Sequence, residues 1–219
     1  MYVDDNAIAA PNRWCIESIR NDLKKVCTLK ELGEATQFLG FQIERSISTR
    51  KIFLSQHKYT EAILRRFGYW DLQPVKTPFP SHEGLPVRWD KNEYTIEEAE
   101  EYIEKTGCIN WLAQGTRVDI AYHVGKLCQA NGGLSQMHLR FAKHLCRYLR
   151  GTIYHGIIIG GTDPNRTLAL HGMADASFAD NQPSRVSTGG YIIFFGGAPL
   201  PGRPRSRRSP LSARPRRSS

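Results

Sequence analysis

The chain has 219 residues, 40% of them hydrophobic and 23% charged, which allows one ordinary domain or two small ones and excludes a chain that is disordered throughout. No apolar run approaches the roughly 18 residues of a membrane span and no signal-peptide pattern opens the chain, so we expect a protein of the cytoplasm or nucleus. The net charge of +9 suggests an anionic partner, but seven arginines lie in residues 201–219, whereas residues 1–200 carry 23 basic and 21 acidic side chains.

Two short apolar stretches, residues 2–3 and 7–10, flank Asp4, Asp5 and Asn6 and predict a β-hairpin at the start of the chain. Adjacent carboxylates at a hairpin tip are the arrangement with which nucleotidyl transferases hold two Mg²⁺ ions about 3.5 to 4 Å apart. An Asp pair also occurs at turns for conformational reasons alone. The Asp pair alone does not decide between a catalytic role and a turn, so the motifs in the rest of the chain are needed.

A helix and a second hairpin are predicted next. Asn12 is the expected N-cap of a helix whose apolar side chains recur at helical spacing on one buried face: Trp14, Ile19, Leu23 and Val26. Residues 37–45 and 51–54 alternate in polarity and predict two paired strands joined by a polar turn. Ser55 is the expected cap of the following helix, and Gly68 is expected to end it.

Helices are predicted for the middle of the chain. Prolines in residues 72–89 predict an extended connection, and the acidic residues 90–105 predict a solvated helix start. Two helices are expected to follow, at residues 102–130 with a break at Gly115 and at residues 135–150. The second has a basic face that is either a surface for a phosphate backbone or an ordinary solvated face: Arg140, Lys143, Arg147 and Arg150.

The last third of the chain changes in character. Residues 168–174 and 186–195 predict two strands. Residues 201–219 are rich in proline, serine and arginine, cannot form a core and predict a disordered tail. The five cysteines, odd in number and without a Cys-x-x-Cys pair, are interpreted as reduced core residues.

Six motifs, in order from residue 1 to about residue 200, resemble the polymerase region of copia-type long-terminal-repeat retrotransposons. Residues 2–5, Tyr-Val-Asp-Asp, are similar to the family's catalytic box, and Leu39, Gly40, Phe41 and Gln42 lie in a segment similar to its primer grip. The other matches are a Ser-Gln-x-x-Tyr box at 55–59, Thr-Pro at 77–78, a Thr-Arg-x-Asp box at 116–122 with Val118 in place of proline, and Arg-Tyr-Leu-Arg-Gly-Thr at 147–152. The resemblance implies that Asp4 and Asp5 bind catalytic Mg²⁺.

Beyond residue 151 the chain resembles the beginning of the family's ribonuclease H domain. Residues 172–180 and 187–191 are similar to two of its strands, although Met173, Ser177 and Phe178 depart from the pattern. The resemblance implies that Asp175 is a metal-binding carboxylate of the nuclease. The alternative for Asp175 is an ordinary Asp at a strand end.

Both activities are expected to be incomplete in this chain. The family's polymerase takes a third carboxylate from a strand before the Asp-Asp hairpin, and its ribonuclease H takes further acids from beyond residue 200. The family's Leu-Ser-Ser-Thr-Glu-Ala-Glu segment, in one choice of synonymous codons, reads one nucleotide later as Ser-Ala-Arg-Pro-Arg-Arg and the start of a serine or arginine codon. Residues 212–218 are Ser-Ala-Arg-Pro-Arg-Arg-Ser. We therefore expect an inactive fragment with a frameshifted tail. The coding DNA tests the frameshift: restoring one nucleotide before residue 212 should give an acidic segment like that of the family.

These observations predict an α+β fold with truncated reverse-transcriptase palm hairpins, thumb- and connection-like helices, the first strands of a ribonuclease H-like domain and a disordered tail. The expected domains are residues 1–71 for the palm and start of the thumb, 72–101 for the connection, 102–152 for the helical region, 153–200 for the partial ribonuclease H and 201–219 for the tail.

The expected function is that of a fragment of an RNA-directed DNA polymerase. In the parent enzyme its partners are an RNA or DNA template-primer, deoxynucleoside triphosphates and other parts of the polyprotein. The alternative is a non-catalytic protein that binds nucleic acid of any sequence through the basic face and the tail. A tail that acts as a nuclear-targeting signal is a third possibility.

Overall fold

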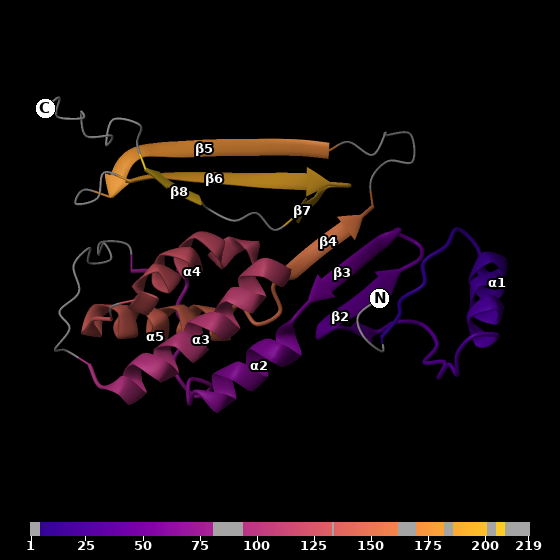
Figure 1. Cartoon of the computed structure of the whole chain (residues 1–219), viewed down its shortest axis with the longest axis horizontal. Helices are drawn as coiled ribbons and strands as arrows, with labels where there is room; N and C mark the ends of the chain where they lie inside the picture. The colour runs from indigo at the N-terminus through magenta and orange to yellow at the C-terminus, as the bar shows by residue number, and fades with distance from the viewer. Residues whose placement is uncertain are drawn as a thin grey trace, which may run out of the picture.

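The computed structural model describes residues 5–80, 94–132, 134–161, 170–181, 186–200 and 205–208. They form a mixed α+β structure with two antiparallel sheets and a group of packed helices (Figure 1). An N-terminal helix lies at one end, the first sheet lies in the middle, and the packed helices lie at the other end beside the second sheet. None of the described helices combines the length and apolarity that crossing a membrane requires.

Helix α1, Arg13–Lys24, projects from one end of the molecule (Figure 1). Asn12 caps it as predicted, because its Oδ1 accepts a hydrogen bond from the Cys15 N–H at 2.9 Å. The predicted buried face is wrong: no residue of α1 is buried, and Trp14 is 74% exposed. An amphipathic face is buried only where another element covers it, and none of the described elements covers α1.

The predicted N-terminal hairpin is only partly testable, because residues 1–4, including Asp4, lie outside the described residues. Asp5 forms an isolated bridge, and residues 7–10, the predicted second strand, are not a strand. A strand requires a continuous ladder of hydrogen bonds to a neighbour, and the proline at position 11, which has no N–H, ends any such ladder directly.

The first sheet has the order β1-β2-β3-β4, formed by Gln37–Phe38, Phe41–Ser46, Lys51–Ser55 and Gly156–Gly160. The pairing of β2 with β3 is confirmed, but the single strand predicted over residues 37–45 is wrong. Leu39 and Gly40 both have positive φ, 49° and 82°, and reverse the chain in a two-residue turn between β1 and β2.

Strand β4 is an element that the sequence analysis does not predict. It pairs with β3 along its whole length, with Lys51 opposite Gly160 and Ser55 opposite Gly156. Residues that follow the last helix therefore complete a sheet begun about a hundred positions earlier. The predicted domain boundary between residues 152 and 153 separates two strands that are hydrogen-bonded partners here.

Four α-helices pack against one another beside this sheet: α2, His57–Arg66; α3, Ile96–Gly115; α4, Ala121–Cys128; and α5, Gln136–Gly151. Two short 3₁₀ helices, η1 at Val118–Ile120 and η2 at Gln129–Gly132, flank α4. The fully buried apolar side chains of the described core come mainly from these helices: Leu64, Ile109, Leu112, Ile120, Leu127, Phe141, Leu145 and Leu149.

The helix ends follow local signals with one exception. Gly68, with φ of 70°, ends α2 as predicted, and the Tyr69 N–H bonds to the Leu64 carbonyl at 2.7 Å. The predicted break at Gly115 is confirmed, since α3 ends there. The predicted cap Ser55 is wrong, because Ser55 is the last residue of β3 and the cap position of α2 is the next residue.

The second sheet contains β5, Leu170–Asn181; β6, Val186–Phe195; and β7, Ala198–Leu200, in that order, and β8, Arg205–Arg208, also pairs with β6. Strands β5 and β6 confirm the two strands predicted in this region. The prediction that the whole of residues 201–219 is disordered is wrong for β8. Backbone groups pair with an open strand edge whatever their side chains are.

Candidate functional site

The predicted metal-binding carboxylates do not meet in the described part of the chain. Asp4 lies outside it, and Asp5 is exposed at the bridge described above. Asp175 is exposed on β5, opposite Gly190 of β6. No three His, Cys, Asp or Glu side chains among the described residues gather closely enough to hold a metal ion. The described residues therefore do not complete a magnesium site.

The predicted primer-grip residues form the tight turn between β1 and β2 and the start of β2, and Phe41, directly after the turn, packs on α3. The Phe41 ring lies 6.3 Å from the Trp111 ring, centroid to centroid. Gly115, one helical turn further along α3, has no room for a side chain, because a Cβ there would lie 2.9 Å from the Phe41 ring. The absence of a side chain at Gly115 lets the hairpin approach the helix closely.

Gln42 fixes the other side of the turn. Its side chain is buried, its Nε2 donates to the Gly40 carbonyl at 3.4 Å, and its Oε1 accepts from the Lys58 N–H at 3.4 Å. Lys58 lies in the first turn of α2. The hairpin is therefore tied to two helices, α2 through Gln42 and α3 through Phe41.

Gln56 joins the start of α2 to the end of α3. Its side chain is 1% exposed, and its Oε1 accepts two hydrogen bonds from Thr116, from the backbone N–H at 2.9 Å and from the hydroxyl at 3.0 Å. The same oxygen would lie 2.2 Å from a Cβ at Gly115. Two of the sequence motifs, at residues 55–59 and 116–122, thus meet through a buried side chain that sequence reasoning does not single out.

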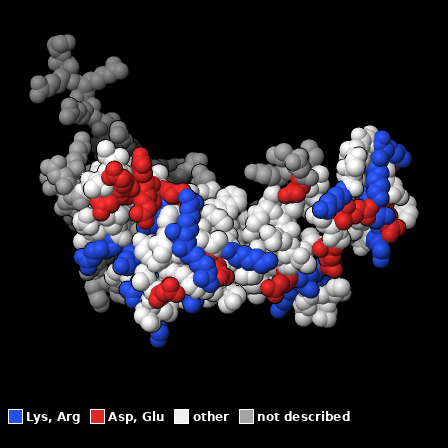
Figure 2. Space-filling view, turned by 90° about the horizontal axis from the view of Figure 1, so that it is seen from below, with Lys and Arg blue, Asp and Glu red and all other residues white. Residues whose placement is uncertain are grey.

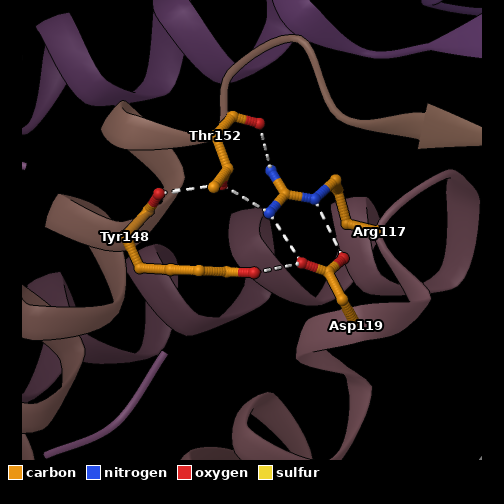
Figure 3. A network of polar contacts seen from close by, with 4 residues as sticks. All are labelled: Arg117, Asp119, Tyr148 and Thr152. Carbon is orange, nitrogen blue, oxygen red and sulfur yellow. Dashed lines mark hydrogen bonds and ion pairs between the residues drawn. The ribbon is translucent and has the colours of Figure 1, made fainter. Parts of the chain in front are cut away.

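Arg117 is the centre of a buried polar network (Figure 3). Its guanidinium donates to both carboxylate oxygens of Asp119, Nε to Oδ1 at 3.0 Å and Nη2 to Oδ2 at 2.8 Å. On its other side it donates to the carbonyl of Thr152 at 3.1 Å and to the hydroxyl of Thr152 at 2.7 Å. The Tyr148 hydroxyl donates to Asp119 Oδ2 at 2.9 Å. The motifs at 116–122 and 147–152 therefore form one hydrogen-bonded unit.

The network sets the protonation state of Asp119. Burial of the carboxyl favours its neutral form, but the Arg117 guanidinium and the Tyr148 hydroxyl outweigh burial and hold the pKa of Asp119 below its usual value. Asp119 also lines a cavity of about 520 Å³ that is bounded by β4 and the turn after β6. Sequence reasoning matched Arg117 and Asp119 to a motif without giving them a role, although a lone Arg-x-Asp pair among apolar residues is a usable signal for a buried ion pair.

Two of the four side chains on the predicted nucleic-acid-binding face of α5 contact residues 70–75, which follow α2. Arg147 Nε donates to the Gln73 carbonyl at 2.7 Å, and Arg150 Nε donates to the Trp70 carbonyl at 2.9 Å. The Val75 N–H bonds back to the Arg147 carbonyl at 3.4 Å. Arg140 and Lys143 are exposed on the same helix. The arginines thus hold residues 70–75 on α5 through Nε.

Comparison with known proteins identifies relatives of this chain. Residues 1–81 match a family model described as "Reverse transcriptase (RNA-dependent DNA polymerase)". The chain is 34% identical over 205 residues to a retrovirus-related Pol polyprotein from transposon TNT 1-94 of Nicotiana tabacum. The aligned residues cover 91% of this chain and 15% of that polyprotein. It is 32% identical over 200 residues to the corresponding polyprotein from transposon RE1 of Arabidopsis thaliana, covering 91% of this chain and 13% of the polyprotein.

A further relative has a length similar to that of this chain. An uncharacterized mitochondrial protein of Arabidopsis thaliana is 31% identical over 196 residues, which cover 90% of this chain and 78% of the relative. No solved structure matches. The chain therefore spans a small part of the Pol polyproteins and most of this shorter relative.

Proposed function

We propose that this chain, which belongs to the copia-type retrotransposon Pol polyprotein family, is the primer-holding part of a reverse transcriptase. The observation that carries the proposal is the packing of Phe41, directly after the Leu39-Gly40 turn, on α3. Positioning a primer end for reaction requires a group held within a fraction of an ångström by a rigid support. Phe41 against Gly115 and Gln42 against α2 supply such a support.

Polymerisation in this family uses divalent metal ions, and Asp4 and Asp5 are the residues expected to hold Mg²⁺, with Asp175 as the candidate in the ribonuclease H-like part. When bound, the metal supplies activation of the primer 3′ hydroxyl and charge stabilisation. Asp4 and Asp5 are two of the three polymerase carboxylates expected from the family. We therefore expect the 219-residue polypeptide to bind primer-template without extending the primer.

Binding and extension are tested separately with the purified 219-residue polypeptide. Fluorescence anisotropy with a labelled DNA primer on an RNA template is expected to show binding that weakens at least fivefold in Phe41→Ala. Ile47→Ala, in the exposed turn between β2 and β3, is the matched control and is expected to bind as the unchanged chain does. Equal affinity of the two variants would contradict the primer-holding role, and Mg²⁺-dependent extension would contradict the expected inactivity.

A second candidate function is sequence-independent nucleic-acid binding without catalysis. The observation that favours it is the charge of residues 135–152, which include Arg140, Lys143, Arg147 and Arg150 but no Asp or Glu. Such binding weakens steeply with salt, because neutralised phosphates release counterions. Deleting residues 201–219 separates two sources of affinity. Affinity that survives deletion comes from α5, whereas affinity that disappears comes from the arginine-rich tail.

The domain limits are also proposals. We place the connection at residues 72–95, because α3 begins at Ile96, we retain residues 201–219 as a frameshifted tail, and we extend the helical unit to include β4. The pairing of β3 with β4 supports this extension, since removing residues 156–160 would leave β3 with an open edge. Limited proteolysis is expected to leave a core that contains both strands, and cleavage at residues 152–153 in the folded protein would contradict the extension.

A further inference from the structure

We propose that Arg65 and Arg150, whose guanidiniums both lie over the ring of Trp70, form a clamp for the phosphate backbone of an RNA or DNA strand. The guanidinium carbons lie 4.3 Å and 4.1 Å from the ring centroid. The two cations are therefore at most roughly 8 Å apart, about one Debye length at physiological ionic strength. The inference rests on the proposed nucleic-acid-binding function and adds Arg65 of α2 and Trp70, which follows α2, to it.

The clamp is assembled by elements that are distant in the sequence. Arg65 lies in the last turn of α2, Trp70 follows that helix, and Arg150 lies in the last turn of α5. Arg150 Nε donates to the carbonyl of Trp70, which holds the guanidinium against the indole. A guanidinium stacked on an aromatic ring is already ordered, so less conformational entropy is lost when it binds a phosphate.

Both arginines keep donors for a ligand. Arg65 pairs with Glu61 through Nε and Nη2, at 2.9 Å and 2.8 Å, and its side chain is 55% exposed. Arg150 uses only Nε in the contacts among the described residues. Since each guanidinium carries five N–H donors, Nη groups of both side chains remain for phosphate oxygens. The Glu61 carboxylate neutralises part of the charge of Arg65, so Arg150 is the stronger of the two cations.

The clamp continues a line of basic side chains on α5. Arg140, Lys143, Arg147 and Arg150 extend over about 15 Å at 1.5 Å per residue, the length of four or five successive phosphates in one strand of a duplex. Figure 2 shows basic side chains in a stripe on the helical part of the molecule, beside an acidic patch. The N-terminal half of α3 is acidic, with Glu97, Glu98, Glu100, Glu101 and Glu104. A polyanion is therefore expected to follow the stripe and avoid α3.

The test measures binding of the full chain to a fluorescein-labelled RNA–DNA hybrid at several KCl concentrations. Arg65→Gln is expected to weaken binding three- to tenfold and to lower the slope of log affinity against log salt by about one. Arg13→Gln, on the exposed surface of α1, removes the same charge far from the clamp and is expected to change neither quantity. Equal effects of the two variants would overturn the clamp.

A second pair of variants separates stacking from charge. Trp70→Leu leaves the net charge unchanged and is expected to weaken binding at least threefold, whereas Trp70→Phe keeps an aromatic surface and is expected to bind nearly as the unchanged chain does. If circular dichroism shows that Trp70→Leu is unfolded, Arg65→Lys replaces it, because lysine keeps the charge and loses the planar fork. Affinity that is unchanged in the folded variant would overturn the clamp.

Failure of the clamp and failure of the proposed function give different results. If the unchanged chain binds the hybrid, and Phe41→Ala weakens that binding while the Arg65 and Trp70 variants do not, the clamp is wrong and the primer-holding role stands. If the unchanged chain does not bind the hybrid at all, both are wrong. Displacement of the hybrid by polyglutamate at equal charge concentration would also overturn the clamp, because it would show general polyanion binding.

Discussion

Arg117 and Asp119, separated by one residue, form a two-point ion pair at the break between α3 and α4, with N–O distances of 3.0 Å and 2.8 Å. The Arg117 side chain is only 2% exposed, so its charge must be neutralised inside the protein. Because the same guanidinium also binds Thr152, the pair determines where the chain leaves α5 and enters β4. Residues 116–122 and 147–152 are thus joined structurally by this ion pair.

Replacement of Asp119 by Asn is expected to lower the free energy of unfolding by about 2 kcal/mol, since it leaves a buried guanidinium without its counter-charge. The expected loss is smaller than for a fully buried pair because the Asp119 side chain is 35% exposed. Urea denaturation measures it. Tyr148→Phe, which removes one hydrogen bond to the same carboxylate, is expected to cost about 1 kcal/mol. A smaller loss for Asp119→Asn than for Tyr148→Phe would contradict the ranking.

The ion pair also predicts a pH dependence of stability. The pKa of Asp119 is lower in the folded protein than in the unfolded chain, so its stabilising contribution is present above the unfolded pKa of about 4 and is lost as the pH falls through the folded pKa. The difference in unfolding free energy between the unchanged chain and Asp119→Asn is expected to be largest near pH 7 and to shrink below pH 4. A difference that grows on acidification would show the opposite sign and rule out this linkage.

Two glycines of α3 are expected to respond in opposite ways to the same substitution. Gly115→Ala places a Cβ 2.2 Å from Gln56 Oε1 and 2.9 Å from Phe41, so we expect a loss of about 2 kcal/mol. Gly107→Ala meets no atom within 4 Å and is expected to stabilise the helix by up to about 1 kcal/mol. Thermal unfolding followed at 222 nm compares them. Equal shifts in Tm would mean that the close contact of the hairpin with α3 is absent.

Leu39 is expected to be unfavourable for stability. Its φ of 49° costs a leucine about 1 kcal/mol, and both central positions of this turn have positive φ. Leu39→Asn creates the Asn-Gly pair that such turns prefer and is expected to raise the free energy of unfolding by about 1 kcal/mol. Its affinity for primer-template is expected to fall, if Leu39 contacts the primer as the resemblance implies. A variant with lower stability would contradict the assigned turn geometry.

The cysteines are expected to differ in reactivity. Cys146 of α5 is buried in the core between the helices, and burial raises the pKa of its thiol to about 12. Cys27, in contrast, is exposed. Because the thiolate is the reactive form, a disulfide reagent at pH 8 is expected to modify Cys27 in the folded protein and Cys146 only after unfolding. Mass spectrometry of the labelled peptides measures the order in which the two cysteines are modified. Early labelling of Cys146 would show that the helical core opens readily.

Elements with local signals were predictable, and elements without them were not. The Asn12 cap, the Gly68 helix end and the break at Gly115 depend on residues within a few positions of each other. Strand β4 consists of three isoleucines between glycines, and it becomes a strand because β3 offers a free edge about a hundred residues away. Trp14 and the apolar side of α1 show the reverse case, a correct helix whose face has no cover.

The sequence by itself determined the family, because ordered motifs over 200 residues can be matched without knowing their contacts. It also supplied the candidate carboxylates Asp4, Asp5 and Asp175. Only the tertiary structure decided how the motifs work together: Gln56 binds Thr116 across 60 positions, and Arg150 binds the Trp70 carbonyl across 80. Such pairs form because the packing of apolar helix and strand faces brings together polar side chains that are distant in the sequence, and the local patterns around those side chains carry no record of their partners.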